Sequence, residues 1–154
     1  MITALGEVQI GASPEAVFDY LADARNEPKW LPGALEVSKV TDGPVALNTR
    51  FEGKYARAGA VSVELVQFDR PHRLTFRARA KIVEFDDAVE LTPHAGGTLL
   101  SARMTAQPRG IMRLFAPMMA KTMEKQFAAN WVHLKEPLEA GARMTPETDR
   151  GEPQ

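Results

Sequence analysis

Hydrophobic and polar positions alternate along most of the chain, which is typical of β-strands. In the segment 2–10, Val8 and Ile10 share one face while Glu7 and Gln9 lie on the other, as in a half-buried strand. Turn-forming residues divide the chain after Gly33 into further strand-like runs, so we expect an antiparallel meander of seven strands in total. The six later strands are expected at about 35–40, 49–58, 60–69, 73–80, 82–92 and 98–107.

Two short helices are expected between the first and second strands. The segment Ser13–Glu15 (Ser-Pro-Glu) begins the first helix, because serine caps a helix N-terminus, proline fits the first helical position and an acidic side chain is favoured there. The segment Arg25–Gly33 has two prolines around Trp30, which is typical of a short second helix or a turn.

The pattern becomes helical between Gly110 and about Ala140. Pro117 lies inside this segment and removes one backbone hydrogen bond, so we expect a kink there or a later helix start. The polar tail 141–154 contains proline and glycine and is expected to be flexible, which makes residues 1–140 a single domain. A continuous apolar stripe of the helix consists of Met119, Met123, Phe127, Trp131, Leu134 and Leu138.

These elements predict an α+β domain in which a curved antiparallel sheet wraps around a long C-terminal helix. Both the sheet and the helix have an apolar face, and curling the sheet around the helix is the economical way to bury the two faces. One helix does not fill a strongly curved sheet, so a gap is expected between them, and ligands bind in gaps of this kind. The sequence therefore predicts an internal cavity for a hydrophobic small molecule.

Composition excludes several classes of function. Lys and Arg total 19 against 20 for Asp and Glu, for a net charge of -1, whereas a protein that binds nucleic acid without sequence preference needs a clustered basic surface. The chain has no cysteine and only three histidines, none at metal-ligand spacing, so we expect neither a metal site nor a cofactor. Because we recognise neither a signal peptide nor a run of ~20 apolar residues, a cytoplasmic location is expected.

Three motifs of this chain resemble those of a known family. They are the Ser-Pro-Glu-x-Val-Phe-x-Tyr-Leu opening of the first helix, the Trp30-Leu31-Pro32 turn and the hairpin 68–74 (FDRPHRL). With the order of elements, they make residues 2 to about 140 similar to the START-like helix-grip superfamily (SRPBCC), and within it to the polyketide cyclase/dehydrase-like family. The resemblance implies a helix-grip fold. Members bind sterols, lipids, plant hormones and polyketides, so the resemblance indicates the fold better than the chemistry.

Asp87 is the most informative anomaly in the sequence. In the run 83–91 the positions on its face are otherwise apolar. An ionised carboxylate there would cost several kcal/mol unless it is paired, so we expect Asp87 to be protonated or matched with a base such as Arg57. It is then a candidate ligand acceptor or general acid/base. The alternative is a β-bulge at Asp86-Asp87 that turns the side chain to solvent.

Three other residues each have two interpretations. Arg57 shares the predicted concave face with Tyr55, but it lies beside the Ala58-Gly59 turn, where its long side chain also reaches water. Tyr55 offers its hydroxyl to a ligand carbonyl, or it is a core tyrosine bonded to a backbone group or water. Trp30 gates the cavity mouth, or it fills the core.

The candidate residues form two overlapping groups. The candidates for catalysis are Asp87, Arg57 and Tyr55. Methionines are included among the ligand contacts because their flexible side chains adapt to a ligand, although they also fill irregular core gaps. The candidate ligand contacts are Trp30, Phe51, Tyr55, Arg57, Phe76, Phe85, Asp87, Met104, Met119, Met123 and Phe127.

Three functions are compatible with these features. The first is binding or carrying a lipid, isoprenoid or polyketide-like molecule, and the second is an enzyme of the cyclase or dehydratase type that acts in the same cavity. The third is docking on a membrane or protein through the apolar segment 111–119, although that segment would also serve to close one end of the cavity. The expected partner is a hydrophobic small molecule, without nucleic acid or stable membrane insertion. The oligomeric state stays open and includes a homodimer.

Overall fold

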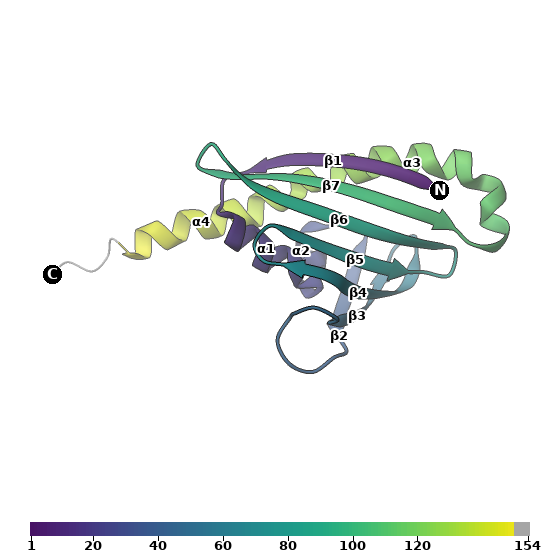
Figure 1. The fold of residues 1–154 in the computed structure, drawn as a ribbon, viewed down its shortest axis with the longest axis horizontal. Coiled ribbons are helices and arrows are strands. Elements are labelled where there is room, and N and C mark those ends of the chain that lie inside the picture. Colours follow the sequence, from purple (N-terminus) through teal and green to yellow (C-terminus); the bar gives the residue numbers. More distant parts are fainter. Residues whose placement is uncertain (150–154) are drawn as a thin grey trace.

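The alternating segments of the chain form a single curved sheet of seven strands, in the order β1-β7-β6-β5-β4-β3-β2, with every neighbouring pair antiparallel (Figure 1). This computed structural model describes residues 1–149, and side chains for residues 1–142. The expected succession along the chain, with one strand, short helices, six strands and a long helical segment, is confirmed. The strands are β1 (Ile2–Ile10), β2 (Ala34–Lys39), β3 (Arg50–Tyr55), β4 (Gly59–Asp69), β5 (Arg73–Arg79), β6 (Val83–His94) and β7 (Gly97–Pro108).

Short helices join the two edge strands β1 and β2, as expected from the sequence. They are α1 (Pro14–Ala22), the 3₁₀ turn η1 (Ala24–Asn26) and α2 (Glu27–Trp30). The Ser13 hydroxyl caps α1 by accepting a hydrogen bond of 3.2 Å from the backbone N–H of Ala16, which satisfies one of the free N–H groups at the helix start.

The C-terminal segment is helical throughout the described chain after Gly110. It consists of η2 (Gly110–Phe115), α3 (Ala116–Asn130), η3 (Trp131–Leu134) and α4 (Lys135–Asp149). Pro117 lies in the first turn of α3, where a missing N–H costs nothing, so it shifts the start of the helix. The expected end of the helix near Ala140 is wrong, because α4 continues to Asp149. Residues 150–154 of the predicted tail lie outside the described residues, and its flexibility stays a prediction.

The helical segment packs across the sheet most closely at β1. Trp131 approaches Gly6 of β1 so tightly that a Cβ atom on Gly6 would lie 2.4 Å from the Trp131 Cδ1 atom. The Trp131 ring stacks on Trp30 at a centroid distance of 5.5 Å and meets Phe127 edge-on at 5.5 Å. This aromatic cluster fills the space under β1.

Candidate functional site

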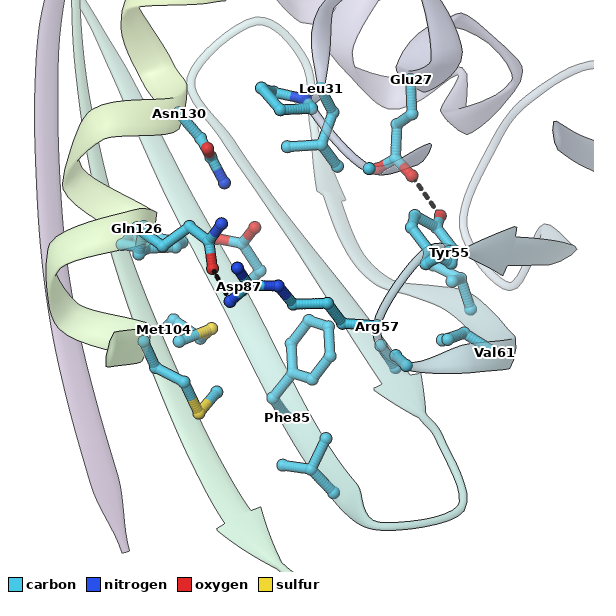
Figure 2. A pocket seen from close by; sticks show the side chains of 18 of the residues that line it. Glu27, Leu31, Tyr55, Arg57, Val61, Phe85, Asp87, Met104, Gln126 and Asn130 are labelled. Atoms are coloured by element: carbon cyan, nitrogen blue, oxygen red, sulfur yellow. Dashed lines mark hydrogen bonds between the residues drawn. The ribbon is translucent and has the colours of Figure 1, made fainter. Parts of the chain in front are cut away.

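A cavity of about 380 Å³ lies between the sheet and α3 (Figure 2). A second, more enclosed chamber of about 160 Å³ adjoins it on the side of the aromatic cluster. The two chambers share part of their walls, including Phe76, Phe85 and Met104. Ligand pockets in proteins commonly measure about 300–1,000 Å³, so the larger chamber has the size of a small-molecule site.

The cavity wall is mainly apolar, because the inward-facing positions of four strands carry hydrophobic side chains. The strand positions are Val61 and Val63 on β4, Phe76 and Ala78 on β5, Phe85 on β6 and Met104 on β7. Helix α3 covers the opening between them with Met123 and Phe127. A ligand in this space would therefore contact hydrocarbon on the sheet side and on the helix side.

Asp87 interrupts this apolar wall from the middle of β6. The strand keeps a regular register there, with Asp87 opposite Phe76 on β5 and Met104 on β7, so the side chain points to the same face as those residues. The preceding residue, Asp86, lies on the outer face and forms an ion pair of 3.0 Å with Arg77. The alternative of a bulge that turns Asp87 to solvent is therefore wrong.

The Asp87 carboxyl lies in an unusual electrostatic environment. Its Oδ1 atom is buried and has no hydrogen-bond partner among the described residues. Burial, and secondarily the negative charge of Glu27, raises the pKa of Asp87 to about 7, because a low-dielectric surrounding disfavours the ionised form. A substantial part of the Asp87 population is therefore protonated at neutral pH.

Glu27 and Tyr55 form a hydrogen-bonded pair on the opposite side of the cavity (Figure 2). Glu27 is the first residue of α2, and its carboxylate accepts the hydrogen bond of the Tyr55 hydroxyl. The Tyr55 ring folds back over Gly53, where a Cβ atom would lie 2.7 Å from the ring, so the absence of a side chain at Gly53 lets the hydroxyl reach Glu27.

Burial controls the protonation of this pair as well. It raises the pKa of Glu27 to about 7, although the hydrogen bond from Tyr55 favours the carboxylate and acts in the opposite direction. The pKa of Tyr55 is raised by burial and by the nearby charge of Glu27. Tyr55 thus stays a neutral donor, and Glu27 is the second acid of this cavity that changes charge near neutral pH.

Arg57 lies at the mouth of the cavity and connects its two sides. Its guanidinium donates a hydrogen bond of 3.2 Å from Nη1 to Oε1 of Gln126 on α3 (Figure 2). Among the ion pairs of residues 1–142, none joins Arg57 to Asp87. The expected ion pair between Arg57 and Asp87 is therefore not formed. Asp87 is instead buried without a counter-ion among the described residues.

Most of the ligand contacts expected from the sequence lie on the cavity wall. The larger chamber is lined by Tyr55, Arg57, Phe76, Phe85, Asp87, Met104, Met123 and Phe127. Trp30 lines only the enclosed chamber, stacked on Trp131, and so fills the core instead of gating the mouth. Phe51 is wholly buried in the core, and Met119 packs beside the core; neither lines a chamber. Both lie on the inward face of their strand or helix, as expected, but at positions along it that do not reach the cavity.

Glu27 is the main site residue that sequence reasoning did not find. It precedes a proline in a short polar stretch, and nothing local distinguishes it from the exposed Glu15 or Glu36. Its burial comes from the tertiary packing of α2, which brings it to Tyr55 at the end of β3. Gln126 and Asn130 were also missed, because they flank the apolar stripe of α3 and look like ordinary surface positions of a helix.

The apolar segment 111–119 does not close the cavity. None of its residues lines either chamber, so the expectation that it seals one end is wrong. Ile111, Leu114 and Met118 have exposed fractions of 72%, 78% and 71%. These side chains form an exposed apolar surface over η2 and the first turn of α3.

Two further findings concern metals and membranes. Among the side chains of residues 1–142, no group of three or more histidine, cysteine or acidic side chains is arranged to hold a metal ion. No helix within residues 1–149 is both long and apolar enough to cross a bilayer.

The fold is shared with solved structures of low sequence identity. A START superfamily protein from Mycobacterium smegmatis superposes with a TM-score of 0.73 at 14% identity, covering 90% of this chain and 97% of that chain. Protein TTHA0849 from Thermus thermophilus gives a TM-score of 0.73 at 18% identity, covering 90% and 98%. The di-domain ARO/CYC StfQ from the steffimycin biosynthetic pathway gives 0.72 at 16% identity, covering 92% of this chain and 52% of StfQ.

Comparison of the sequence itself gives the family. None of the curated proteins matches this chain. The sequence family described as polyketide cyclase / dehydrase and lipid transport matches residues 1–139, which include every strand, the short helices and α3. With the seven-stranded helix-grip fold, this match shows that the chain belongs to the polyketide cyclase / dehydrase and lipid transport family.

Proposed function

We propose that this protein binds or carries a hydrophobic small molecule in the cavity between the sheet and α3. The observation that carries the proposal is the apolar chamber of about 380 Å³. Apolar surface that stays uncovered inside a domain forgoes stabilisation of roughly 25 cal/mol per Å². A ligand that covers Phe76, Phe85 and Met104 recovers this free energy, which gives a hydrophobic molecule a reason to bind.

The first test identifies any molecule that stays bound to the protein during purification. Native mass spectrometry of the purified protein, followed by solvent extraction, is expected to find an apolar molecule at a stoichiometry near one per chain. The neutral fluorescent dye N-phenylnaphthylamine is then expected to bind the extracted protein saturably.

Two alanine-to-phenylalanine variants locate the binding. Ala78→Phe projects a ring into the chamber from β5 and is expected to abolish dye binding. Ala60→Phe adds the same ring to an exposed position of β4 and is the matched control. If Ala78→Phe binds the dye as well as Ala60→Phe does, the dye lies elsewhere and the proposal is wrong.

The cyclase or dehydratase alternative is favoured by one specific observation. The cavity holds two carboxyl groups with pKa values of about 7 and a neutral tyrosine, and groups of this pKa serve as general acids and bases at neutral pH. In a dehydration, one such group removes a proton while another protonates the departing hydroxyl.

The alternative is tested by comparing the molecules extracted from the wild type and from Asp87→Asn. A dehydratase is expected to accumulate in the variant a molecule heavier by one water than the one in the wild type. Identical molecules in the two proteins would argue for a carrier.

The exposed surface over η2 supports a second role, docking on an anionic membrane. Ile111, Leu114 and Met118 are exposed, Arg113 lies in the same segment, and Arg109 directly precedes η2. Apolar side chains next to basic ones bind the boundary of an anionic bilayer through burial and charge together.

Vesicle sedimentation tests this role. Vesicles with phosphatidylglycerol are expected to sediment the wild type, whereas the double variant Leu114→Asp/Met118→Asp stays in solution. Leu35→Asp, at a β2 position of 63% exposure, is the matched control and should sediment normally. Equal sedimentation of the double variant and the control would exclude this surface.

A further inference from the structure

Acidic side chains outnumber basic ones in the cavity wall. Glu27 and Asp87 both line the larger and the enclosed chamber, one from α2 and one from β6. The negative charge of Glu27 contributes to the raised pKa of Asp87. Two carboxylates in one low-dielectric space repel each other, so the cavity disfavours the ionisation of both.

The protein supplies few donors to these acids. The Tyr55 hydroxyl is bonded to Glu27, and the Arg57 guanidinium is bonded to Gln126 at the mouth. The lining residues contributed by β4, β5, β7 and α3 include no titratable side chain, and their side-chain donors are the neutral amides of Gln126 and Asn130. Oδ1 of Asp87 is left without a partner among the described residues, although buried polar atoms are almost always hydrogen-bonded.

We propose that the ligand of this cavity is an apolar molecule with a basic amine, whose ammonium group lies between Asp87 and Glu27. This inference rests on the proposed function, binding of a hydrophobic small molecule. An ammonium group donates up to three hydrogen bonds and accepts none, so it matches the buried Oδ1 of Asp87, which has no donor among the described residues. Its charge also relieves the repulsion between the two carboxylates, whereas an anionic head group would add to it.

Proton linkage gives this inference a distinctive signature. Near pH 7 the two carboxyls carry protons for part of the time, because their pKa values are about 7. An ammonium group favours the ionised forms, so the complex with an amine releases protons to the buffer. A neutral ligand of the same shape has no reason to release them. The other ionisable groups of the lining are Tyr55, which stays neutral, and Arg57, which stays charged.

Three probes with one apolar body separate the head groups. Phenylbutylamine, phenylbutanol and phenylbutyrate carry an ammonium, a hydroxyl and a carboxylate on the same phenylbutyl chain. By isothermal titration calorimetry at pH 8, the amine is expected to bind about 10–100-fold more tightly than the alcohol, since hydrogen bonds to charged groups contribute about 1.5–3 kcal/mol. Titration in two buffers of different ionisation enthalpy should show proton release near pH 7 for the amine alone.

The variants assign the effect to these carboxyls. Asp87→Asn and Glu27→Gln keep the shape and remove the charge, and each is expected to lower amine affinity about 10-fold or more while changing alcohol affinity by less than about 3-fold. Asp86→Asn removes the neighbouring carboxylate on the outer face and should bind the amine as the wild type does. Thermal melting of each variant confirms that it is folded.

The possible results are distinguishable. Tightest binding of the alcohol or of phenylbutyrate would overturn the amine inference while the proposed hydrophobic ligand stands. The same conclusion follows if the amine binds tightest but Asp87→Asn and Glu27→Gln both leave its affinity unchanged. If none of the three probes binds but N-phenylnaphthylamine does, the amine inference also fails. If the dye fails as well, the proposed function itself is wrong.

Discussion

Asp87 and Glu27 make the stability of this protein depend on pH. Both carboxyls have a pKa of about 7 in the folded protein, whereas the ordinary values are 3.8 for an aspartate and 4.5 for a glutamate. The folded state holds these protons more tightly than the unfolded chain does. The contribution of the two carboxyls to the unfolding free energy is therefore fully present below about pH 4. It is lost as the pH rises towards about 7, through the folded-state pKa values. The usual paired carboxylate has the opposite dependence.

Asp87→Asn should remove its share of this pH dependence. Asparagine has the shape of the protonated acid and does not titrate, so the variant is expected to lose less stability than the wild type between pH 4 and pH 8. The difference should amount to about 1–3 kcal/mol of unfolding free energy, measured by urea denaturation at several pH values. Asp86→Asn, on the outer face, is the control. Parallel curves for Asp87→Asn and the wild type would show that Asp87 does not titrate in this range.

These two acids also show what sequence reasoning resolves at single residues. Asp87 was identified because strand alternation fixes which face a side chain occupies, and the regular register of β6 keeps that relation. Glu27 was missed because its burial comes from the contact between α2 and Tyr55, which lie far apart in the sequence. Local patterns report the face of a residue but not the distant segment that covers it.

Among the elements, β1 and the helical segment approach each other unusually closely. A Cβ atom on Gly6 would lie 2.4 Å from Trp131 Cδ1 and 2.7 Å from Nε1. Alanine normally stabilises a strand relative to glycine by about 0.5–1 kcal/mol, so any loss of stability in Gly6→Ala must come from the indole ring.

Gly6→Ala is expected to destabilise the protein by about 1–3 kcal/mol, the usual cost of overpacking. A double-mutant cycle with Trp131→Phe separates this contact from other effects, because the smaller ring leaves room for the new methyl group. Urea denaturation of the four proteins should give a coupling free energy of about 1 kcal/mol or more. Additive effects would mean that Trp131 does not rest on β1 in solution.

The elements themselves were largely predictable, and the exceptions have physical causes. Caps and turns specify local structure, so Ser13 marked the start of α1 correctly, and of the two alternatives for Pro117 the shifted helix start is the one found. The helix end near Ala140 was misplaced because Gly141 and Pro146 are poor intrinsic helix formers. Leu138 is buried and Glu139 accepts a 2.8 Å hydrogen bond from the Gly11 N–H, and these tertiary contacts anchor α4 at its start.

For the molecule as a whole, the cavity is a region that side chains leave unfilled. A well-filled core loses stability when a side chain is enlarged, whereas an open chamber accepts the added ring and buries it. Ala78 faces the chamber from β5, between Val63 of β4 and Phe85 of β6. Ala106 on β7 is equally small and wholly buried, but it lines neither chamber.

The same substitution at these two alanines should therefore have opposite effects. Ala78→Phe is expected to raise the unfolding free energy of the ligand-free protein by about 0.5–2 kcal/mol, as cavity-filling changes commonly do, while it abolishes ligand binding. Ala106→Phe is expected to lower it by about 1–3 kcal/mol or more through overpacking. Urea denaturation of the extracted proteins measures both. If Ala78→Phe were as destabilising as Ala106→Phe, side chains would already fill this space in solution, and the protein would lack the room that a ligand requires.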